Sequence, residues 1–146
     1  MKRSLWLLAG VAILLVAADA KDDEKKEYER FTGTWVFESV EVGGEKLALD
    51  ALKGAGLTID GNKFTAKEKE GAVHGTYKVD LSKKPKTIDV TFSDGPEKGK
   101  TMLGIYELDG DTYKVCFDIS GKERPTKFES KKGTMLVLET LKREMK

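Results

Sequence analysis

Histidine and cysteine, the side chains most often used for nucleophilic and metal chemistry, occur once each in this chain, as His74 and Cys116. A structural zinc site takes four such ligands, so the chain cannot assemble a His/Cys cluster of the usual composition. Ser–His–Asp catalysis would depend on His74, and no serine lies in the Gly-x-Ser-x-Gly context that exposes a nucleophile. The sequence therefore predicts no catalytic residue, no bound metal and no cofactor, and we expect a protein that is not an enzyme.

Asp109 and Asp111 are spaced like the first two ligands of a calcium-binding loop, with Gly110 between them. The third ligand would fall on Tyr113, which has no carboxylate, and the glycine that lets such a loop turn is missing. An Asp-Gly pair between two alternating apolar runs is instead typical of a tight β-hairpin. We therefore expect a hairpin turn here and no calcium site.

Residues 1–20 have the three parts of a secretory signal peptide. Lys2 and Arg3 supply the positive charge, residues 5–17 form the apolar stretch, and residues 18–20 (Ala-Asp-Ala) form the cleavage site. We expect cleavage after Ala20, export to the periplasm or the medium, and no membrane association afterwards. An uncleaved anchor is the alternative, although the apolar stretch is short for a membrane span.

Charge is almost balanced over the whole chain, with 26 Lys and Arg against 25 Asp and Glu. Proteins that bind nucleic acid through phosphate contacts concentrate positive charge, so we expect no nucleic acid partner. An exported protein with one cysteine can form no internal disulfide, and its core must hold the fold together. We expect Cys116 to be a small, partly buried strand residue; a free reactive thiol or an intermolecular bridge is the alternative.

Any binding residues must be positioned by strands, because apolar and polar residues alternate from Thr34 onward. Turn-forming Gly, Asp, Asn and Pro interrupt this alternation at near-regular intervals. The expected strands are 34–42, 57–60, 63–70, 73–81, 87–93, 102–108, 113–119, a short one around Phe128, and 135–141. We predict an all-β fold: an antiparallel meander of eight to nine strands that closes into a small barrel, with an open sandwich as the alternative.

Two short helices are expected beside the strands. Residues 21–32 form a charged lead-in to the barrel domain (33–146), and Tyr28 and Phe31 within it are three apart, so they would dock together against an open end of the barrel. The leucines of residues 46–53 fit one or two helical turns. Strands 102–108 and 135–141 are apolar on both faces and must be covered from outside, which we expect from one of these two segments.

Several phrases of the chain resemble known proteins. Residues 31–35 (Phe-Thr-Gly-Thr-Trp) resemble the opening of lipocalin-like domains. The other phrases resemble a family of exported, lipocalin-like (calycin-like) bacterial domains of uncharacterised role that is abundant in planctomycetes; they are residues 75–78, 84–89, 94–100, 104–111, 124–128 and 141–143. The resemblance covers nearly all of the chain after residue 20. It implies a small exported barrel and supplies no catalytic residues.

The resemblance also implies how one end of the barrel is closed. In lipocalins the tryptophan of the opening motif closes the barrel floor, and a basic residue from the last strand lies across it. Trp35 matches the tryptophan, and Arg143 or Lys142 could match the basic residue through a cation–π contact.

The leading functional hypothesis is an exported barrel that binds a small apolar or amphipathic ligand in its lumen, with the hydroxyl of Tyr77 or Tyr106 orienting it. The candidate lumen residues are Trp35, Phe37, Phe64, Tyr77, Phe92, Tyr106 and Phe117. These aromatics could equally fill a solid barrel. In that case the protein would be a protein-interaction or envelope-structural module that acts through loops 94–100 and 121–125.

Overall fold

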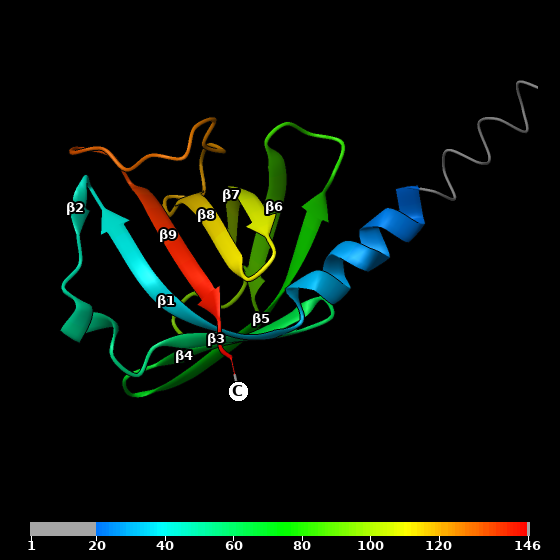
Figure 1. The fold of residues 1–146 in the computed structure, drawn as a ribbon. Helices are drawn as coiled ribbons and strands as arrows, with labels where there is room; N and C mark the ends of the chain where they lie inside the picture. The colour runs from blue at the N-terminus through cyan, green and yellow to red at the C-terminus, as the bar shows by residue number, and fades with distance from the viewer. Residues whose placement is uncertain (1–19, 146) are drawn as a thin grey trace, which may run out of the picture.

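The computed structural model of the protein describes residues 20–145. Eight antiparallel strands form a closed barrel, with one further short strand, one helix and a 3-10 turn (Figure 1). The predicted all-β barrel is confirmed, and the open sandwich is wrong, because the first strand also pairs with the last. The expected signal peptide, apart from its last residue, lies outside the described residues.

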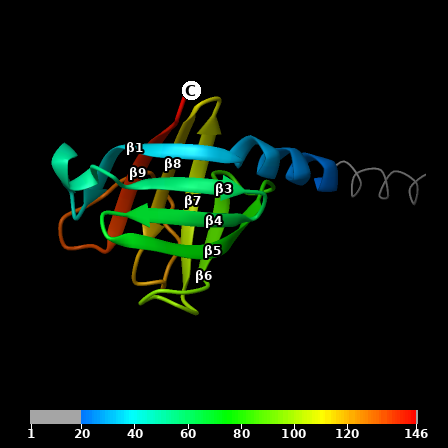
Figure 2. The ribbon, with the colours of Figure 1, turned by 90° about the horizontal axis from the view of Figure 1, so that it is seen from below.

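The strands follow one another around the barrel in chain order. They are β1 (Gly33–Val42), β2 (Glu45–Lys46), β3 (Gly56–Asp60), β4 (Lys63–Glu68), β5 (Gly71–Asp80), β6 (Lys86–Phe92), β7 (Thr101–Asp109), β8 (Thr112–Asp118) and β9 (Leu136–Arg143). From β3 to β9 each strand pairs with the next, and β9 returns to β1. Figure 2 shows β1, β3, β4 and β5 side by side, with the strands of the opposite wall crossing behind them.

Strand β1 closes the barrel because it is long enough to serve two neighbours. Residues 33–36 pair with β3 and residues 35–42 pair with β9, so the two pairings overlap at Trp35 and Val36. The register with β9 shifts between Phe37 and Ser39, which marks a β-bulge. A bulge increases the local twist of a strand, and that twist helps β1 to curve around the barrel.

Two-residue loops connect β3 to β4 and β7 to β8. In both loops the first residue is a glycine, Gly61 or Gly110, with a positive φ of 62° or 58°. A type II′ turn has a glycine at this position, and such turns match the right-handed twist of a hairpin. The Asp109-Gly110-Asp111 segment is therefore a hairpin turn, as the sequence predicted.

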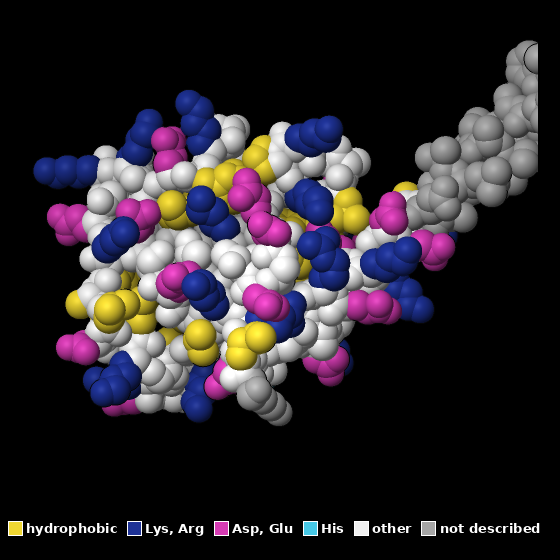
Figure 3. Space-filling view, viewed as in Figure 1, with side chains coloured by type: hydrophobic (Ala, Val, Ile, Leu, Met, Phe, Trp, Pro, Cys, Tyr) yellow, Lys and Arg dark blue, Asp and Glu magenta, His cyan; other side chains and the backbone are white. Residues whose placement is uncertain are grey.

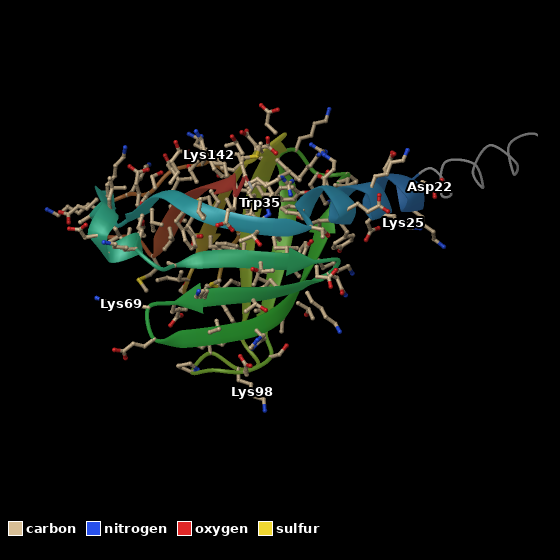
Figure 4. The ribbon with its side chains drawn as sticks, turned by 60° about the horizontal axis from the view of Figure 1, so that its bottom comes forward. Asp22, Lys25, Trp35, Lys69, Lys98 and Lys142 are labelled. Atoms are coloured by element: carbon tan, nitrogen blue, oxygen red, sulfur yellow. The ribbon has the colours of Figure 1, made fainter. Side chains whose placement is uncertain are left out.

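Residues 20–31 form a helix that runs into one end of the barrel. Its first turns project away from the strands, where Asp22 and Lys25 point into solvent (Figure 4). Its last turn carries Glu27, which is 2% exposed, and Phe31, which is fully buried. The ring of Phe31 packs edge-on against Tyr77 and Tyr113, with centroid distances of 5.4 and 5.1 Å. The helix thus plugs this end of the barrel.

The helical turn expected within residues 46–53 is present as a single 3-10 turn. Only Leu49–Leu52 is helical, as a 3-10 turn with no buried residue, and Leu49 is 74% exposed. This segment therefore does not cover the strands that are apolar on both faces, and that part of the expectation is wrong. Neighbouring Gly54 has a positive φ of 83° and ends the turn.

The expected strand around Phe128 is also wrong, because residues 119–135 form a loop. A closed barrel leaves no unpaired strand edge at this point, since β8 and β9 pair directly with each other. The loop packs instead against the outside of the barrel. Arg124 donates to the backbone oxygen of Gly104 at 2.9 Å, and the thiol of Cys116 donates to that of Glu129 at 3.3 Å. This loop covers the outer apolar face of β7 and β8, where Ile105 and Cys116 are buried.

Two strand glycines make room for aromatic rings inside the barrel. A Cβ atom at Gly75 would overlap the backbone oxygen of Thr91 and lie 2.6 Å from the ring of Phe64. A Cβ atom at Gly104 would lie 2.6 Å from the ring of Phe117. Each ring therefore occupies the space that a side chain at the glycine would take.

Candidate functional site

A cavity of about 150 Å³ lies inside the barrel. All eight barrel strands and the end of the helix contribute to its wall, because every second residue of a strand faces the lumen. The lining residues are Phe31, Phe37, Leu57, Ile59, Phe64, Ala66, Tyr77, Ile88, Val90, Phe92, Met102, Tyr113, Val115, Phe117 and Glu139. Apart from Glu139 the lining is entirely apolar or aromatic, as expected for a site that takes an apolar ligand.

The cavity is closed at one end of the barrel and reaches solvent at the other. Near the helix its lining residues, such as Phe31 and Tyr77, are buried. At the opposite end Leu57, Ala66 and Met102 are only half-buried. The entrance therefore lies at the end away from the helix, and a molecule entering there would have the helix as its floor.

Trp35 and Arg143 close the floor together. The indole N–H of Trp35 donates to the backbone oxygen of Phe31 at 2.8 Å. The guanidinium carbon of Arg143 lies 4.3 Å from the centre of the Trp35 ring, and one of its nitrogens donates to the backbone oxygen of Thr32 at 2.7 Å. The neighbouring Lys142 pairs instead with Glu38 at the surface, 3.4 Å away. Of the two basic residues considered, Arg143 is the one that the structure brings over Trp35.

A buried charge cluster fixes the helix to the barrel. The carboxylate of Glu27 accepts hydrogen bonds from the hydroxyl of Tyr106 at 2.7 Å, from Lys86 at 2.9 Å and from Arg30 at 2.6 Å. Burial acts to raise the pKa of Glu27, but these hydrogen bonds and the two positive charges outweigh it and hold the pKa below its usual value. The carboxyl is therefore ionised at neutral pH and serves the fold.

The seven predicted lumen aromatics divide into two groups. Those that line the cavity are Phe37, Phe64, Tyr77, Phe92 and Phe117. Trp35 and Tyr106 do not line it; both are buried in the floor, next to Phe31 and Glu27. The hydroxyl of Tyr77 donates to the backbone oxygen of Gly61 and that of Tyr106 donates to Glu27, so each can meet a ligand only as an acceptor. That one of them orients a ligand stays a prediction.

The residue that sequence reasoning missed is Glu139. It lies on β9 between Val137 and Leu141, both buried, and it pairs with Val115 on the neighbouring strand β8. Its side chain belongs to the cavity lining. The signal was present in the sequence: Glu139 has the same strand parity as Val137 and Leu141, so any assignment that turned these two inward also turned an acid into the lumen.

Glu139 has unusual electrostatics because it lies within an apolar wall. Burial, without a compensating hydrogen bond or positive charge among residues 20–145, raises the pKa of Glu139 to about 7. Burial and the nearby charge of Glu139 also raise the pKa of Tyr113, whose ring lines the same cavity. The lumen thus contains an acid that is poised near neutrality and a tyrosine that stays protonated.

His74 and Cys116 lie outside the lumen and apart from each other. The imidazole of His74 is exposed on β5 and lies 2.8 Å from the carboxylate of Asp94, in the loop after β6. Cys116 is fully buried on the outer face of β8, and burial raises the pKa of its thiol. A raised pKa lowers the thiolate fraction, so this environment makes a cysteine less reactive.

Metal sites and membrane spans are not evident within the described part of the chain. Over residues 20–145, no group of three or more His, Cys, Asp or Glu side chains could hold a metal ion. None of the helices found there is long and apolar enough to cross a membrane. On the face drawn in Figure 3, positive and negative side chains are intermingled.

Loops 94–100 and 121–125, both singled out from the sequence, differ in how closely they contact the barrel. Loop 94–100 is exposed almost throughout and carries an ion pair between Glu97 and Lys100 at 2.8 Å. Arg124, at the end of the other loop, is tied down: it donates to Asp89 at 2.7 Å as well as to the barrel backbone. An open groove of about 530 Å³ lies beside Arg124 on the outside of the barrel.

Comparison with models of protein families, with curated proteins and with solved structures finds no match to this chain. The family resemblance described from the sequence phrases therefore stays a prediction. The fold and the cavity are the observations from which a function can be argued.

Proposed function

We propose that this protein is an exported, non-enzymatic, lipocalin-like barrel that binds one small apolar or amphipathic molecule in its lumen. The observation that carries the proposal is the apolar cavity of about 150 Å³, closed by the helix at one end and open at the other. A solid barrel would have no such space. An apolar cavity of roughly this volume is large enough for a benzene-sized molecule.

The driving force would be the burial of apolar surface. Each square ångström removed from water contributes about 25 cal/mol, so a compact ring with some 200 Å² of surface gains about 5 kcal/mol before the cost of association. Much of the wall is aromatic: the rings of Phe64 and Phe92, for example, meet edge to face with their centroids 5.8 Å apart. We therefore expect a small ligand with millimolar to micromolar affinity.

The first test is binding of toluene, followed by NMR of the methyl groups that line the cavity. We expect saturable shifts in the wild-type protein and their loss in Ala66→Phe, because Ala66 lines the entrance and a phenyl ring there would fill it. The matched control is Ala72→Phe, which adds the same ring at an exposed position of β5. Toluene shifts that are absent from the wild type, or that persist unchanged in Ala66→Phe, would exclude the lumen as the site.

The second test addresses the natural ligand. Native and denaturing mass spectra are compared for the protein purified from its own source. A reproducible extra mass that is lost on denaturation supports a carrier. A bare chain in both spectra, together with no toluene binding, would favour the alternative of an interaction module that acts through exposed loops such as 94–100.

A further inference from the structure

We propose that the lumen is built for a cationic ligand, a small primary amine with an apolar body, whose ammonium group is bound by Glu139. This inference rests on the proposed lumenal binding and names the chemical class of the ligand. It is carried by geometry: one carboxyl in an otherwise apolar wall, facing a cavity that opens to solvent. A lone acid in such a wall is a disadvantage to the fold unless a partner arrives with the ligand.

No positively charged side chain among residues 20–145 offsets the charge of Glu139. On the paired strand β8, Cys116 lies near Glu139, and burial raises the pKa of its thiol. The titratable groups that share the lumen wall with Glu139 are Tyr77 and Tyr113. Burial raises the pKa of both hydroxyls, so neither carries a charge near neutral pH. The positive charges nearest the floor belong to Arg143, which lies over Trp35, and to Arg30 and Lys86, which bind Glu27. Glu139 is therefore left to be neutralised by a proton or by a ligand.

Glu139 also lies at a suitable position on the strand. It is half-buried between the buried Val137 and Leu141, so a bound ammonium group would lie in the wall of the cavity, partly shielded from bulk water. A charge-assisted hydrogen bond is strong in such surroundings. The apolar part of the ligand would then lie against rings such as Phe64 and Phe117.

The cavity volume limits the size of the amine. About 150 Å³ holds a single ring with a short side chain and excludes steroids, retinoids and long acyl chains unless the barrel expands. Benzylamine is a suitable probe, and benzyl alcohol is its uncharged counterpart of nearly the same shape. A primary amine of this kind stays protonated at pH 8, as lysine does.

The experiment is calorimetric titration of the purified protein with benzylamine and with benzyl alcohol at pH 8. We expect benzylamine to bind at least about tenfold more tightly, and Glu139→Gln to remove this preference while leaving the affinity for benzyl alcohol unchanged. The matched control is Glu107→Gln, which removes an exposed carboxylate from the outer face of β7 and should preserve the preference. Because Glu139 has a pKa of about 7, the preference should also shrink at pH 5.5, where its carboxyl is protonated.

Two results would overturn the inference. Equal affinity for the amine and the alcohol in the wild type would show that Glu139 does not recognise charge. An affinity that rises on acidification would show that the protonated carboxyl acts as a donor to a neutral or anionic ligand. In both cases benzyl alcohol still binds in the lumen and the proposed function survives; failure of both probes and of toluene would reject the proposed function itself.

Discussion

Glu27 is a single side chain on which the position of the helix depends. Glu27→Ala should lower the free energy of unfolding by about 2–3 kcal/mol, because it leaves the Tyr106 hydroxyl buried without an acceptor and frees two bound cations. Glu27→Gln should cost less, since an amide oxygen can still accept from Tyr106. Urea unfolding measures both. Glu29→Ala, at an exposed position of the same helix, is the control and should stay within about 0.5 kcal/mol of wild type.

Glu27 also makes the stability of the protein depend on pH in the acidic range. The pKa of Glu27 is lower in the folded protein than its usual 4.5, so its contribution is present above that value and is lost as pH falls through the folded pKa. The difference in stability between wild type and Glu27→Gln should therefore be full at pH 6 and shrink towards pH 3. A difference that is constant with pH would mean that the carboxylate charge contributes nothing.

The pKa of Glu139 is shifted in the opposite direction to that of Glu27, so its effect on stability appears in a different pH range. Its pKa in the fold, about 7, lies above the usual 4.5, so its favourable contribution is complete below 4.5 and is lost as pH rises through 7. Without ligand, the wild type should lose roughly 2–3 kcal/mol of stability between pH 4.5 and 8 relative to Glu139→Gln, allowing for water in the cavity. Urea unfolding across this range measures the loss. Parallel pH profiles for the two proteins would contradict a poised carboxyl in the lumen.

For single residues, the sequence predicted the aromatic side chains of the lumen better than it predicted Glu139. Phe37, Phe64 and Phe117 could be assigned to the lumen because period-two alternation fixes their face. Glu139 was missed because β9 is apolar at successive positions, so the inward face of the strand is not evident from the strand alone; once Val137 and Leu141 are assigned inward, Glu139 follows them. Tyr106 has the parity of a lumen residue but lies in the floor, where a helix residue distant in sequence binds its hydroxyl. Local pattern contains no information about such a contact.

At the level of elements, the loop at residues 119–135 acts as a cover for the outer wall. Its attachment can be measured through Cys116, the only cysteine of the chain, which lies beneath it. Labelling of the native protein by a disulfide reagent should be slow, because the thiol is fully buried and its pKa is raised. Arg124→Ala removes the side chain that ties the loop to Gly104 and Ile88, and should speed labelling about tenfold or more.

Lys127→Ala is the control for this measurement, because Lys127 is an exposed residue of the same loop. It should leave the labelling rate unchanged. Equal rates for wild type and Arg124→Ala would mean that reagent reaches Cys116 without opening of the loop at Arg124. Fast labelling of the wild type, with the fold intact, would favour the reactive-thiol alternative.

The loop also shows where prediction of elements fails. The strands on both sides of it have clear alternation and turn signals, and their expected positions agree with β8 and β9 to within a few residues. Phe128 has an apolar side chain for a different reason: it packs on the outside, where Lys114 lies 5.7 Å from its ring centre. An apolar residue in a covering loop and one in a short strand look alike in sequence.

For the whole molecule, closure of the barrel is the property that local patterns predict least directly. The pairing of Trp35 with Arg143 joins the first and last strands of the barrel, and no local sequence pattern links two strands so far apart in the chain. The barrel was predicted from strand number and the absence of crossover helices, which limit the folds available to such a chain. The depth of the cavity depends on how far the helix enters, and neither quantity has a signature in the sequence.

The last prediction concerns the helix at residues 20–31, whose start projects from the barrel and whose end closes the barrel floor. Its exposed start, residues 20–23, projects beyond the strands, whereas Phe31 is fully buried among aromatic rings (Figure 1). A chain that begins at Glu24 should therefore lose less than about 1 kcal/mol. A chain that begins at Thr32 should lose at least the 3–5 kcal/mol expected for removal of a buried phenylalanine, and should bind the dye ANS through its opened end. Urea unfolding and dye fluorescence compare the two chains, and equal stability with no dye binding would show that the barrel closes this end without the helix.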